Sequence, residues 1–193
     1  MMLSENEIKE MFVKAGALKK GHFRLTSGLH SAQYVDKFKI LSKPALAAPL
    51  LKEMAVPWKD KNIDIVVGPA IGGIILAYEI ARQLGTEGIF LERKNGEMTF
   101  GRGFKIEPGQ RVLVVEDVVT TGGSVTEVCE QVIKAGGVIS GISLMVDRSG
   151  GNVSFESETH ALMTLELEVY DENSCPLCRE GVDLVAPGST GKS

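Results

Sequence analysis

The sequence predicts an α/β protein with a central, mostly parallel sheet flanked by helices. Four short runs rich in β-branched residues, at 63–67, 88–92, 111–115 and 138–146, alternate with stretches of helical periodicity. These runs are almost continuously apolar, which is typical of strands buried on both faces of a parallel sheet. Because such sheets bind ligands at the carboxyl ends of their strands, we expect the functional site at that edge.

The bulk composition fits one compact domain, which we expect to span residues 1–193. A net charge of −4 argues against a general nucleic-acid-binding or membrane-binding surface, so an anionic substrate would need a concentrated cationic pocket. The first ten residues, MMLSENEIKE, lack the pattern of a signal peptide, and no apolar run is long enough to span a bilayer. We therefore expect a cytoplasmic enzyme.

The first elements can be placed from capping and proline signals. Ser4 and Glu7 form the pattern of a capping box, and apolar residues then follow at helical spacing. Residues 21–39 are polar with interspersed aromatics, which predicts a loop and short strands over a site. Pro44 suits the first turn of a helix that should end before Pro57.

The segments after the four strands carry the chemistry. They read GPAIGG, ERKNGEMTFGRG, EDVVTTGGS and DRSGG in chain order, so that three are glycine-rich and the remaining one holds a basic pair. Residues 161–169 alternate in polarity, which predicts an edge strand or hairpin partner. The chain after Tyr170 reads as irregular.

The stretch VLVVEDVVTTGGS, residues 112–124, predicts a phosphate-binding loop at the end of the third strand. Gly122 and Gly123 allow a tight turn in which backbone N–H groups converge. The helix expected from about Ser124 directs its N-terminus at the same point, and neighbouring hydroxyl groups add donors. This combination suits a phosphate monoester.

Two carboxylates, Glu116 and Asp117, precede that loop, although carboxylates only accept hydrogen bonds and repel phosphate. They can accept from two neighbouring hydroxyls or approach a hydrated metal ion. A ribose 5-phosphate satisfies the acids and the loop together. An ordinary strand–turn–helix crossover with a capped helix is the alternative that the residues leave open.

The same stretch resembles the binding motif for 5-phosphoribosyl 1-diphosphate (PRPP) of type I phosphoribosyltransferases over its whole length. The resemblance implies the type I phosphoribosyltransferase fold, with a small hood over the active site made from about residues 1–40 and 170–193. It also implies that the acids bind the ribose hydroxyls and that the loop binds the 5-phosphate. The implied PRPP-binding residues of this motif are Glu116, Asp117, Val118, Val119, Thr120, Thr121, Gly122, Gly123 and Ser124.

The segment FRLTSGLHSAQYVDK, residues 23–37, resembles the N-terminal signature of the orotate phosphoribosyltransferase family. With GPAIGG, ERK and VDRSG in the right order, the resemblance extends from about residue 12 to 190. It implies transfer of phosphoribose from PRPP to orotate, giving orotidine 5′-monophosphate and pyrophosphate. It further implies Mg²⁺ bound mainly through PRPP, with Asp117 as a candidate contact, and a homodimer that shares its catalytic loop across the interface.

The resemblance assigns the residues after the second strand to that mobile catalytic loop over the pyrophosphate. Many family members carry a second lysine and a histidine further along the loop, and a lysine at the position of Thr26. This chain lacks them, and we hypothesise that Arg102 supplements Lys94. The implied catalytic residues are Lys94, Arg93, Arg102 and Asp117, of which Arg93 and Lys94 also bind PRPP.

The remaining implied contacts lie after the first and fourth strands and in the N-terminal signature. Residues Ala70, Ile71 and Gly72 resemble the pyrophosphate loop, in which we expect a cis peptide bond between Ala70 and Ile71. The implied orotate-binding residues are Tyr34, Val35, Thr120 and Arg148. The guanidinium fork of Arg148 suits a planar carboxylate and carbonyl edge.

Two further motifs are set aside. The CPLC stretch at 175–178 could bind zinc, but a site needs about four ligands, there is no second cysteine pair, and the histidines are scattered along the chain at His22, His30 and His160. We therefore expect CPLC to be a structural element of the tail. The final GSTGKS imitates the end of a P-loop, but Ala186 stands where the first glycine belongs.

Two other functions stay open beside orotate transfer. One is a phosphoribosyltransferase of the same fold that acts on a purine base, which only a substrate test separates from the first. The other is a non-enzymatic PRPP sensor that binds nucleic acid, for which a basic face would be expected rather than a net charge of −4.

Overall fold

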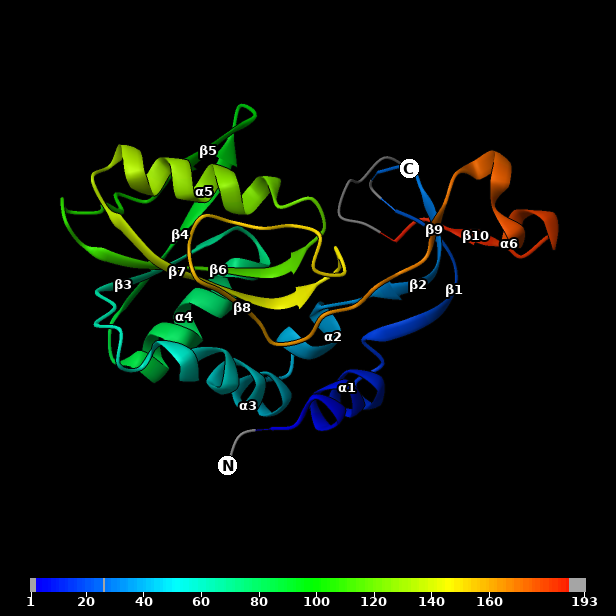
Figure 1. The fold of residues 1–193 in the computed structure, drawn as a ribbon, viewed down its shortest axis with the longest axis horizontal. Helices are drawn as coiled ribbons and strands as arrows, with labels where there is room; N and C mark the ends of the chain where they lie inside the picture. The colour runs from blue at the N-terminus through cyan, green and yellow to red at the C-terminus, as the bar shows by residue number, and fades with distance from the viewer. Residues whose placement is uncertain (1–2, 26, 188–193) are drawn as a thin grey trace.

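The computed structural model describes residues 3–25 and 27–187, whose strands form two sheets (Figure 1). The larger sheet contains, in spatial order, β5 (Glu97–Phe100), β4 (Glu87–Lys94), β3 (Ile65–Pro69), β6 (Arg111–Val119), β7 (Val138–Asp147) and β8 (Thr159–Ala161). The smaller sheet contains β10 (Leu184–Val185), β1 (Leu18–Arg24), β2 (His30–Val35) and β9 (Val169–Tyr170). We call the larger sheet with its helices the body, and residues 18–35 and 169–187 the hood.

The helices of the body cover both faces of its sheet. They are α1 (Glu5–Lys14), α2 (Phe38–Leu41), α3 (Pro44–Ala55) with the short turn η1 (Val56–Trp58), α4 (Gly72–Leu84) and α5 (Gly123–Lys134). In Figure 1, α5 lies on one side of the sheet, while α3 and α4 lie on the other. The predicted parallel sheet flanked by helices is confirmed, because β3, β4, β6 and β7 pair in parallel.

Alternation along the buried strands divides the core into two clusters. In β6, Leu113 and Val115 face the cluster that contains α3 and α4, whereas Val112 and Val114 face the cluster under α5. All four side chains are fully buried. Because successive side chains of a strand point to opposite faces, a strand with helices on both sides must be apolar throughout.

The strand order places the ends of two predicted site segments side by side. The chain passes from β3 through α4 to β4 on one side, whereas β6 pairs with β3 on the other side. The order therefore reverses at β3 and β6, which is the topological switch point where ligands of open α/β sheets bind.

The first helix follows its predicted cap. The Ser4 backbone N–H donates to Glu7 Oε2 at 2.8 Å, and the Glu7 N–H donates to Ser4 Oγ at 3.3 Å. The helix buries Ile8 and Phe12 in the core cluster that also holds α3. This part of residues 1–40 thus packs on the body, whereas β1 and β2 belong to the hood.

The prediction of one strand over residues 161–169 is wrong. The first and last residues of this segment belong to β8 and β9, and between these strands only two isolated bridges form, from Thr164 to Asp147 and from Glu166 to Ser149. The alternating polarity has another cause, since Met163 packs into the body while its neighbours are more exposed. The segment crosses from β8 to β9 and so connects the two sheets, as the orange trace in Figure 1 shows.

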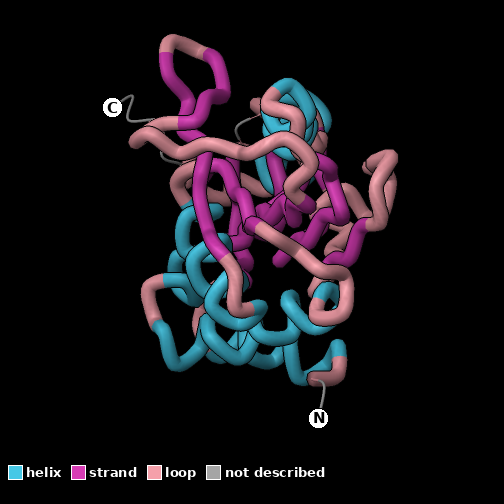
Figure 2. The backbone as a smooth tube through the Cα atoms, turned by 90° about the vertical axis from the view of Figure 1, so that its left-hand side faces the viewer, coloured by secondary structure: helices cyan, strands magenta, loops and turns pink. Residues whose placement is uncertain are grey.

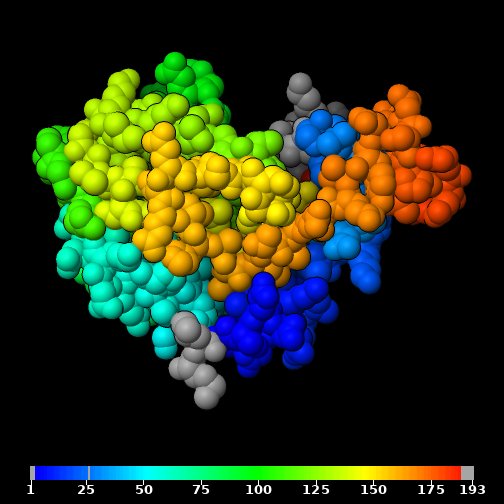
Figure 3. All heavy atoms as spheres, in the orientation of Figure 1, coloured from blue at the N-terminus to red at the C-terminus, as the bar shows by residue number. Residues whose placement is uncertain are grey.

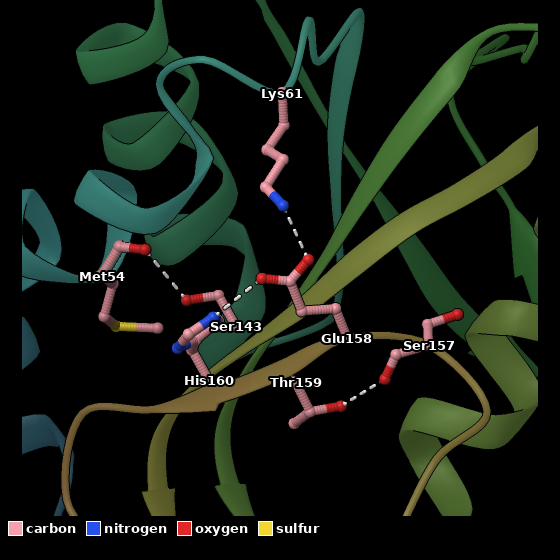
Figure 4. A network of polar contacts seen from close by, with 7 residues as sticks. All are labelled: Met54, Lys61, Ser143, Ser157, Glu158, Thr159 and His160. Atoms are coloured by element: carbon pink, nitrogen blue, oxygen red, sulfur yellow. Dashed lines mark hydrogen bonds and ion pairs between the residues drawn. The ribbon is translucent and has the colours of Figure 1, made fainter.

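Polar contacts attach β8, just before this segment, to the body (Figure 4). Glu158 accepts a hydrogen bond from Lys61 Nζ at 2.8 Å and lies 3.1 Å from His160 Nε2. Beneath them, Ser143 Oγ on β7 donates to the backbone carbonyl of Met54 on α3 at 3.1 Å. The sheet edge is therefore closed by side chains rather than by a long strand.

The hood has little apolar interior. It also contains the short turn η2 (Glu172–Ser174) and α6 (Pro176–Arg179), and it forms a lobe at the side of the body (Figure 3). Between residues 169 and 187 the single buried residue is Cys175. A sheet with so few buried apolar residues needs another source of stability.

The expectation that the histidines are scattered is wrong for two of them. The ligand atoms of His22, His30, Cys175 and Cys178 lie within 4.8 Å of one another in the hood. Among the described residues, no helix combines the length and hydropathy needed to cross a bilayer. The terminal GSTGKS lies outside the described residues from its first glycine onward.

Candidate active site

The predicted phosphate loop joins β6 to α5 at the switch point. Strand β6 extends through both acids to Val119, and α5 begins at Gly123 after a left-handed Gly122 with φ of 80°. A small cavity of ≈ 50 Å³ lies between them, lined by residues 118–125 and Glu116. Its position at the N-terminus of a twelve-residue helix gives it the positive potential and free N–H groups that bind phosphate.

Both predicted acids are buried beside this cavity. Glu116 is 7% exposed and Asp117 is 2% exposed. Asp117 Oδ1 accepts a hydrogen bond from Lys37 Nζ at 2.7 Å, and the Asp117 N–H donates to Glu116 Oε1 at 2.9 Å. Lys37 therefore brings a cation from the segment before α2 to the carboxyl ends of β3 and β6.

The burial of the acids changes their protonation. Burial and the adjacent Asp117 carboxylate raise the pKa of Glu116 to about 8. Burial also raises the pKa of Asp117, although the Lys37 ammonium opposes that rise. In the ligand-free protein near neutral pH, the pair therefore tends to retain a proton, and it can both donate to and accept from hydroxyl groups.

The predicted pyrophosphate loop lies directly against these acids. The expected cis peptide bond between Ala70 and Ile71 is present. A Cβ atom at Gly72 would overlap Asp117 Oδ2, so only glycine fits where α4 starts. Ile71 is exposed at 67%, which leaves the loop open on its outer side. The structure thus brings the two predicted PRPP segments into contact.

A larger pocket of ≈ 390 Å³ lies between the hood and the body. It contains two predicted orotate-binding residues, Thr120 and Arg148. The residues that line it are Leu25, Ser27, Leu29, Thr120, Thr121, Arg148, Ser149, Asn152, Glu166, Leu167 and Val169. It shares Thr120 and Thr121 with the phosphate cavity, so the two cavities adjoin each other.

Arg148 is positioned by the turn that follows β7. Asp147 accepts from the Ser149 N–H at 2.8 Å and from the Gly151 N–H at 3.2 Å, which fixes the backbone around Arg148. Arg148 Nε is buried and has no hydrogen-bond partner among the residues that the structure describes. Burial lowers the pKa of Arg148. A buried guanidinium donor of this kind needs a planar acceptor, which a carboxylate ligand supplies.

The other two predicted orotate contacts lie at the edge of this arrangement. Val35 is 4% exposed and packs into the core cluster of α3 and α4. The Tyr34 ring packs against Phe23, with 5.6 Å between the ring centroids. Neither residue lines the pocket in this conformation of the chain.

The predicted catalytic loop is a hairpin of β4 and β5 that projects from the body (Figures 1 and 2). Arg93 forms an ion pair with Glu127 on α5 at 2.6 Å, and Arg102 lies 3.4 Å from Glu92. Lys94 is exposed at the end of β4. The structure thus holds these cations on the hairpin or, for Arg102, in the turn that follows it, and the contacts named here do not bring them to Asp117.

Sequence reasoning missed Lys37 and several pocket residues, among them Asn152 and Glu166. Lys37 is the last residue of the signature segment 23–37, and its place in that segment was the available signal. The pocket residues had no comparable signal because they come from three separate segments. Thr26, where many family members carry lysine, lies outside the described residues.

Comparison with known proteins shows to which family the chain belongs. A family model described as phosphoribosyl transferase domain matches residues 45–168. The orotate phosphoribosyltransferase of Thermoanaerobacter sp. (strain X514) is 50% identical over 187 residues, covering 97% of this chain and 98% of the relative. The one of Caldicellulosiruptor bescii is 49% identical over 183 residues, with coverage of 95% and 96%.

Solved structures agree with the sequence relatives. The orotate phosphoribosyltransferase of Aeropyrum pernix has a TM-score of 0.68 at 25% identity, covering 82% of this chain and 94% of that one. An adenine phosphoribosyltransferase of Rhodothermus marinus has a TM-score of 0.63 at 22% identity, covering 81% and 99%. The second likeness shows the shared fold alone.

Proposed function

The chain belongs to the phosphoribosyl transferase family, and from that premise we propose that it transfers phosphoribose from PRPP to orotate. The products are orotidine 5′-monophosphate and pyrophosphate, a step of pyrimidine nucleotide synthesis that leads to UMP. The observation that carries the proposal is the pocket in which Arg148 faces the phosphate loop across Thr120 and Thr121. We place the enzyme in the cytoplasm, and its substrates are small molecules rather than nucleic acids or membranes.

The acids and the loop hold the phosphoribose. The 5-phosphate accepts hydrogen bonds from the N–H groups at the start of α5 and from neighbouring hydroxyls, among them Ser124. The ribose hydroxyls bind Glu116 and Asp117, while Lys37 keeps the Asp117 carboxylate in position. Positive charge that develops on the ribose is stabilised by these carboxylates.

Arg148 orients the base. Its buried Nε–H and terminal N–H groups match the carboxylate and carbonyl edge of orotate in a bidentate contact. We also assign base contacts to Tyr34 on β2 and to the backbone of Val35, although neither residue lines the pocket in the conformation described above. The protein need not supply a base, because the pyrimidine nitrogen can lose its proton before attack.

The residues around Asp117 fit Mg²⁺, because carboxylate oxygens are the ligands that this cation prefers. Asp117 would be the protein residue nearest to such an ion, which would supply positive charge to offset the negative charge of the departing pyrophosphate. Glu116 and Asp117 hold the ribose in place, and Ala70 to Gly72 hold the pyrophosphate beside them.

The hairpin supplies the cations that cover the pyrophosphate. We place Lys94, Arg93 and Arg102 in this role and assign the chain to a homodimer in which each hairpin serves the neighbouring copy. Lys94→Ala should lower turnover by about 100-fold or more, and Arg102→Ala by about tenfold. Steady-state rates at saturating substrate measure both, and unchanged turnover in Arg102→Ala would contradict its supporting role.

The test of the reaction follows orotate by its ultraviolet absorbance in the presence of protein, PRPP and Mg²⁺. We expect the absorbance to fall only when all components are present. Arg148→Ala should weaken orotate binding by about 10- to 100-fold and leave PRPP binding unchanged. Arg179→Ala, on the exposed side of α6, is the matched control.

Two results would contradict the proposal. Turnover of PRPP with adenine or hypoxanthine but not with orotate would favour a purine-specific enzyme of this fold. PRPP binding without turnover on any base would favour a regulatory protein.

A further inference from the structure

Four side chains with metal-binding atoms converge in the hood, outside the candidate active site. His22 lies on β1 and His30 on β2, while Cys175 and Cys178 come from the start of α6. Their ligand atoms all lie within 4.8 Å of one another, and three of the four residues are buried. Two chain segments about 150 residues apart thus contribute one pair of ligands each.

The distances in this cluster are close to those around a tetrahedral ion. Cys175 Sγ and Cys178 Sγ lie 3.5 and 3.7 Å from His22 Nε2, and Cys178 Sγ lies 3.3 Å from His30 Nδ1. A zinc ion with Zn–N of about 2.05 Å and Zn–S of about 2.3 Å separates its N and S ligands by about 3.5 Å. The two nitrogens are 2.9 Å apart and need to separate by only about 0.4 Å to fit the same geometry.

The tautomer of His22 is fixed from outside the cluster. Its Nδ1 lies 2.8 Å from the backbone carbonyl of Val182, and a carbonyl can only accept a hydrogen bond. Nδ1 therefore carries the proton of the neutral ring, which leaves the lone pair of Nε2 for the cluster, where His30 Nδ1 and both sulfurs lie within 3.7 Å of it. A backbone carbonyl that orients a histidine in this way is the usual outer partner of a metal ligand.

The chemistry of the ligands selects the metal. Two thiolates and two imidazoles in a closed, four-membered set are typical of structural zinc, and two intervening residues between the cysteines are the usual spacing. From this set we propose that His22, His30, Cys175 and Cys178 bind one Zn²⁺ ion that stabilises the hood. The site has no ligand position left for a substrate, so its role is structural.

The hood buries few side chains of its own, so a bound ion would add to its stability. Apart from Cys175, every residue from 169 to 187 is at least partly exposed. The ion joins β1 and β2 to α6, which few apolar contacts hold together. Zinc binding supplies folding free energy to small domains of this kind. Because Leu25, Leu29 and Val169 line the base pocket, the ion also supports one wall of that pocket.

Metal content of the purified full chain tests the proposal without reference to its activity. After expression with zinc and desalting under reducing conditions, we expect about one zinc ion per chain. Cys129→Ser, which changes a cysteine on α5, should keep the metal, whereas Cys178→Ser should lose most of it. Retention of stoichiometric zinc in Cys178→Ser would overturn the proposal.

Cobalt replacement gives a second readout on the unmodified chain, so a variant that fails to fold does not leave the question open. Protein loaded with Co²⁺ should show the absorption of a tetrahedral ion and charge-transfer bands from thiolate sulfur. Absence of stoichiometric metal, or a Cys175–Cys178 disulfide in protein isolated anaerobically, would overturn the proposal. An inactive enzyme that still carries zinc would contradict the proposed function and leave the zinc site supported.

Discussion

The body and the hood bury different kinds of side chain. In the body, apolar side chains fill two clusters on either side of β6, and its buried acids lie only at the carboxyl edge. In the hood, the buried groups include His22, His30, Ser31 and Cys175. The body is therefore stabilised by the hydrophobic effect, whereas the hood depends on specific polar contacts between distant segments.

Because of this difference, the two regions should tolerate different kinds of substitution. A body of this kind tolerates changes at its surface and is sensitive to changes of volume inside. The hood has few buried apolar side chains, so its folded structure depends mainly on the metal-binding atoms of His22, His30, Cys175 and Cys178. The predictions below test this contrast, from the largest expected effect to the smallest.

The pH dependence of stability should have opposite signs in the two regions. Because the folded pKa of Glu116 is raised from 4.5 to about 8, its favourable contribution is present below pH 4.5 and is lost as the pH rises toward 8. A full shift of this size corresponds to at most about 5 kcal/mol. The melting temperature of ligand-free protein, measured without added Mg²⁺ and without a chelator so that the hood keeps its metal, should therefore fall between pH 5 and 8.5.

Glu116→Gln is the control for this effect, since it removes the titrating group while keeping the shape. Its melting temperature should change much less over the same range, and an equally steep decline would contradict the assignment. Metal binding by the hood, measured with Co²⁺, should instead strengthen as the pH rises, because the ligands must be deprotonated.

The same truncation should have unequal effects in the two regions. Leu113→Ala removes a fully buried side chain from β6 and should lower the free energy of unfolding by about 2–5 kcal/mol. Leu184→Ala on β10, where the side chain is 42% exposed, should change it by less than about 0.5 kcal/mol. Urea denaturation measures both, and equal losses would break the contrast.

Adding volume to the body should also be costly. A Cβ atom at Gly141 on β7 would overlap the ring of Trp58, which is fully buried. Gly141→Ala should therefore lower the free energy of unfolding by about 1–3 kcal/mol. A double variant with Trp58→Phe should recover part of this loss, and no recovery would show that the cost arises elsewhere.

The smallest effect is expected at the exposed edge of β8. Lys61→Ala removes the ion pair with Glu158, in which both side chains are more than two-fifths exposed. Because exposed ion pairs contribute little, the free energy of unfolding should change by less than about 0.5 kcal/mol. A larger loss in urea denaturation would mean that this network holds the sheet edge more strongly than its exposure suggests.

Much of the body could be predicted from local sequence signals. The four apolar runs correspond to β3, β4, β6 and β7, and the capping box and Pro44 mark the starts of α1 and α3. The stretch 112–124 also predicted the loop and the helix after it. These features could be predicted from the sequence because each depends on residues that are close together in the chain.

The rest could not be read in this way because it depends on contacts between distant residues. The pairing of Lys37 with Asp117 joins residues 80 positions apart, and His22 meets Cys175 across 153 positions. Along the sequence, His22 and His30 lie far from Cys175 and Cys178, so the four residues did not look like one site. Polarity does alternate over residues 161–169, but the cause is that Met163 packs on the body and not that the whole segment forms a strand.

The pairing of β1 with β10 has a consequence for synthesis on the ribosome. Strand β1 is made early, yet its partner β10 and the cysteines of α6 emerge more than 140 residues later. The body can assemble as soon as β8 has left the exit tunnel, while β1 and β2 wait for the segment that carries α6 and β10. The wall of the base pocket is thus finished last, so a truncated product would carry a formed phosphoribose site but no closed hood.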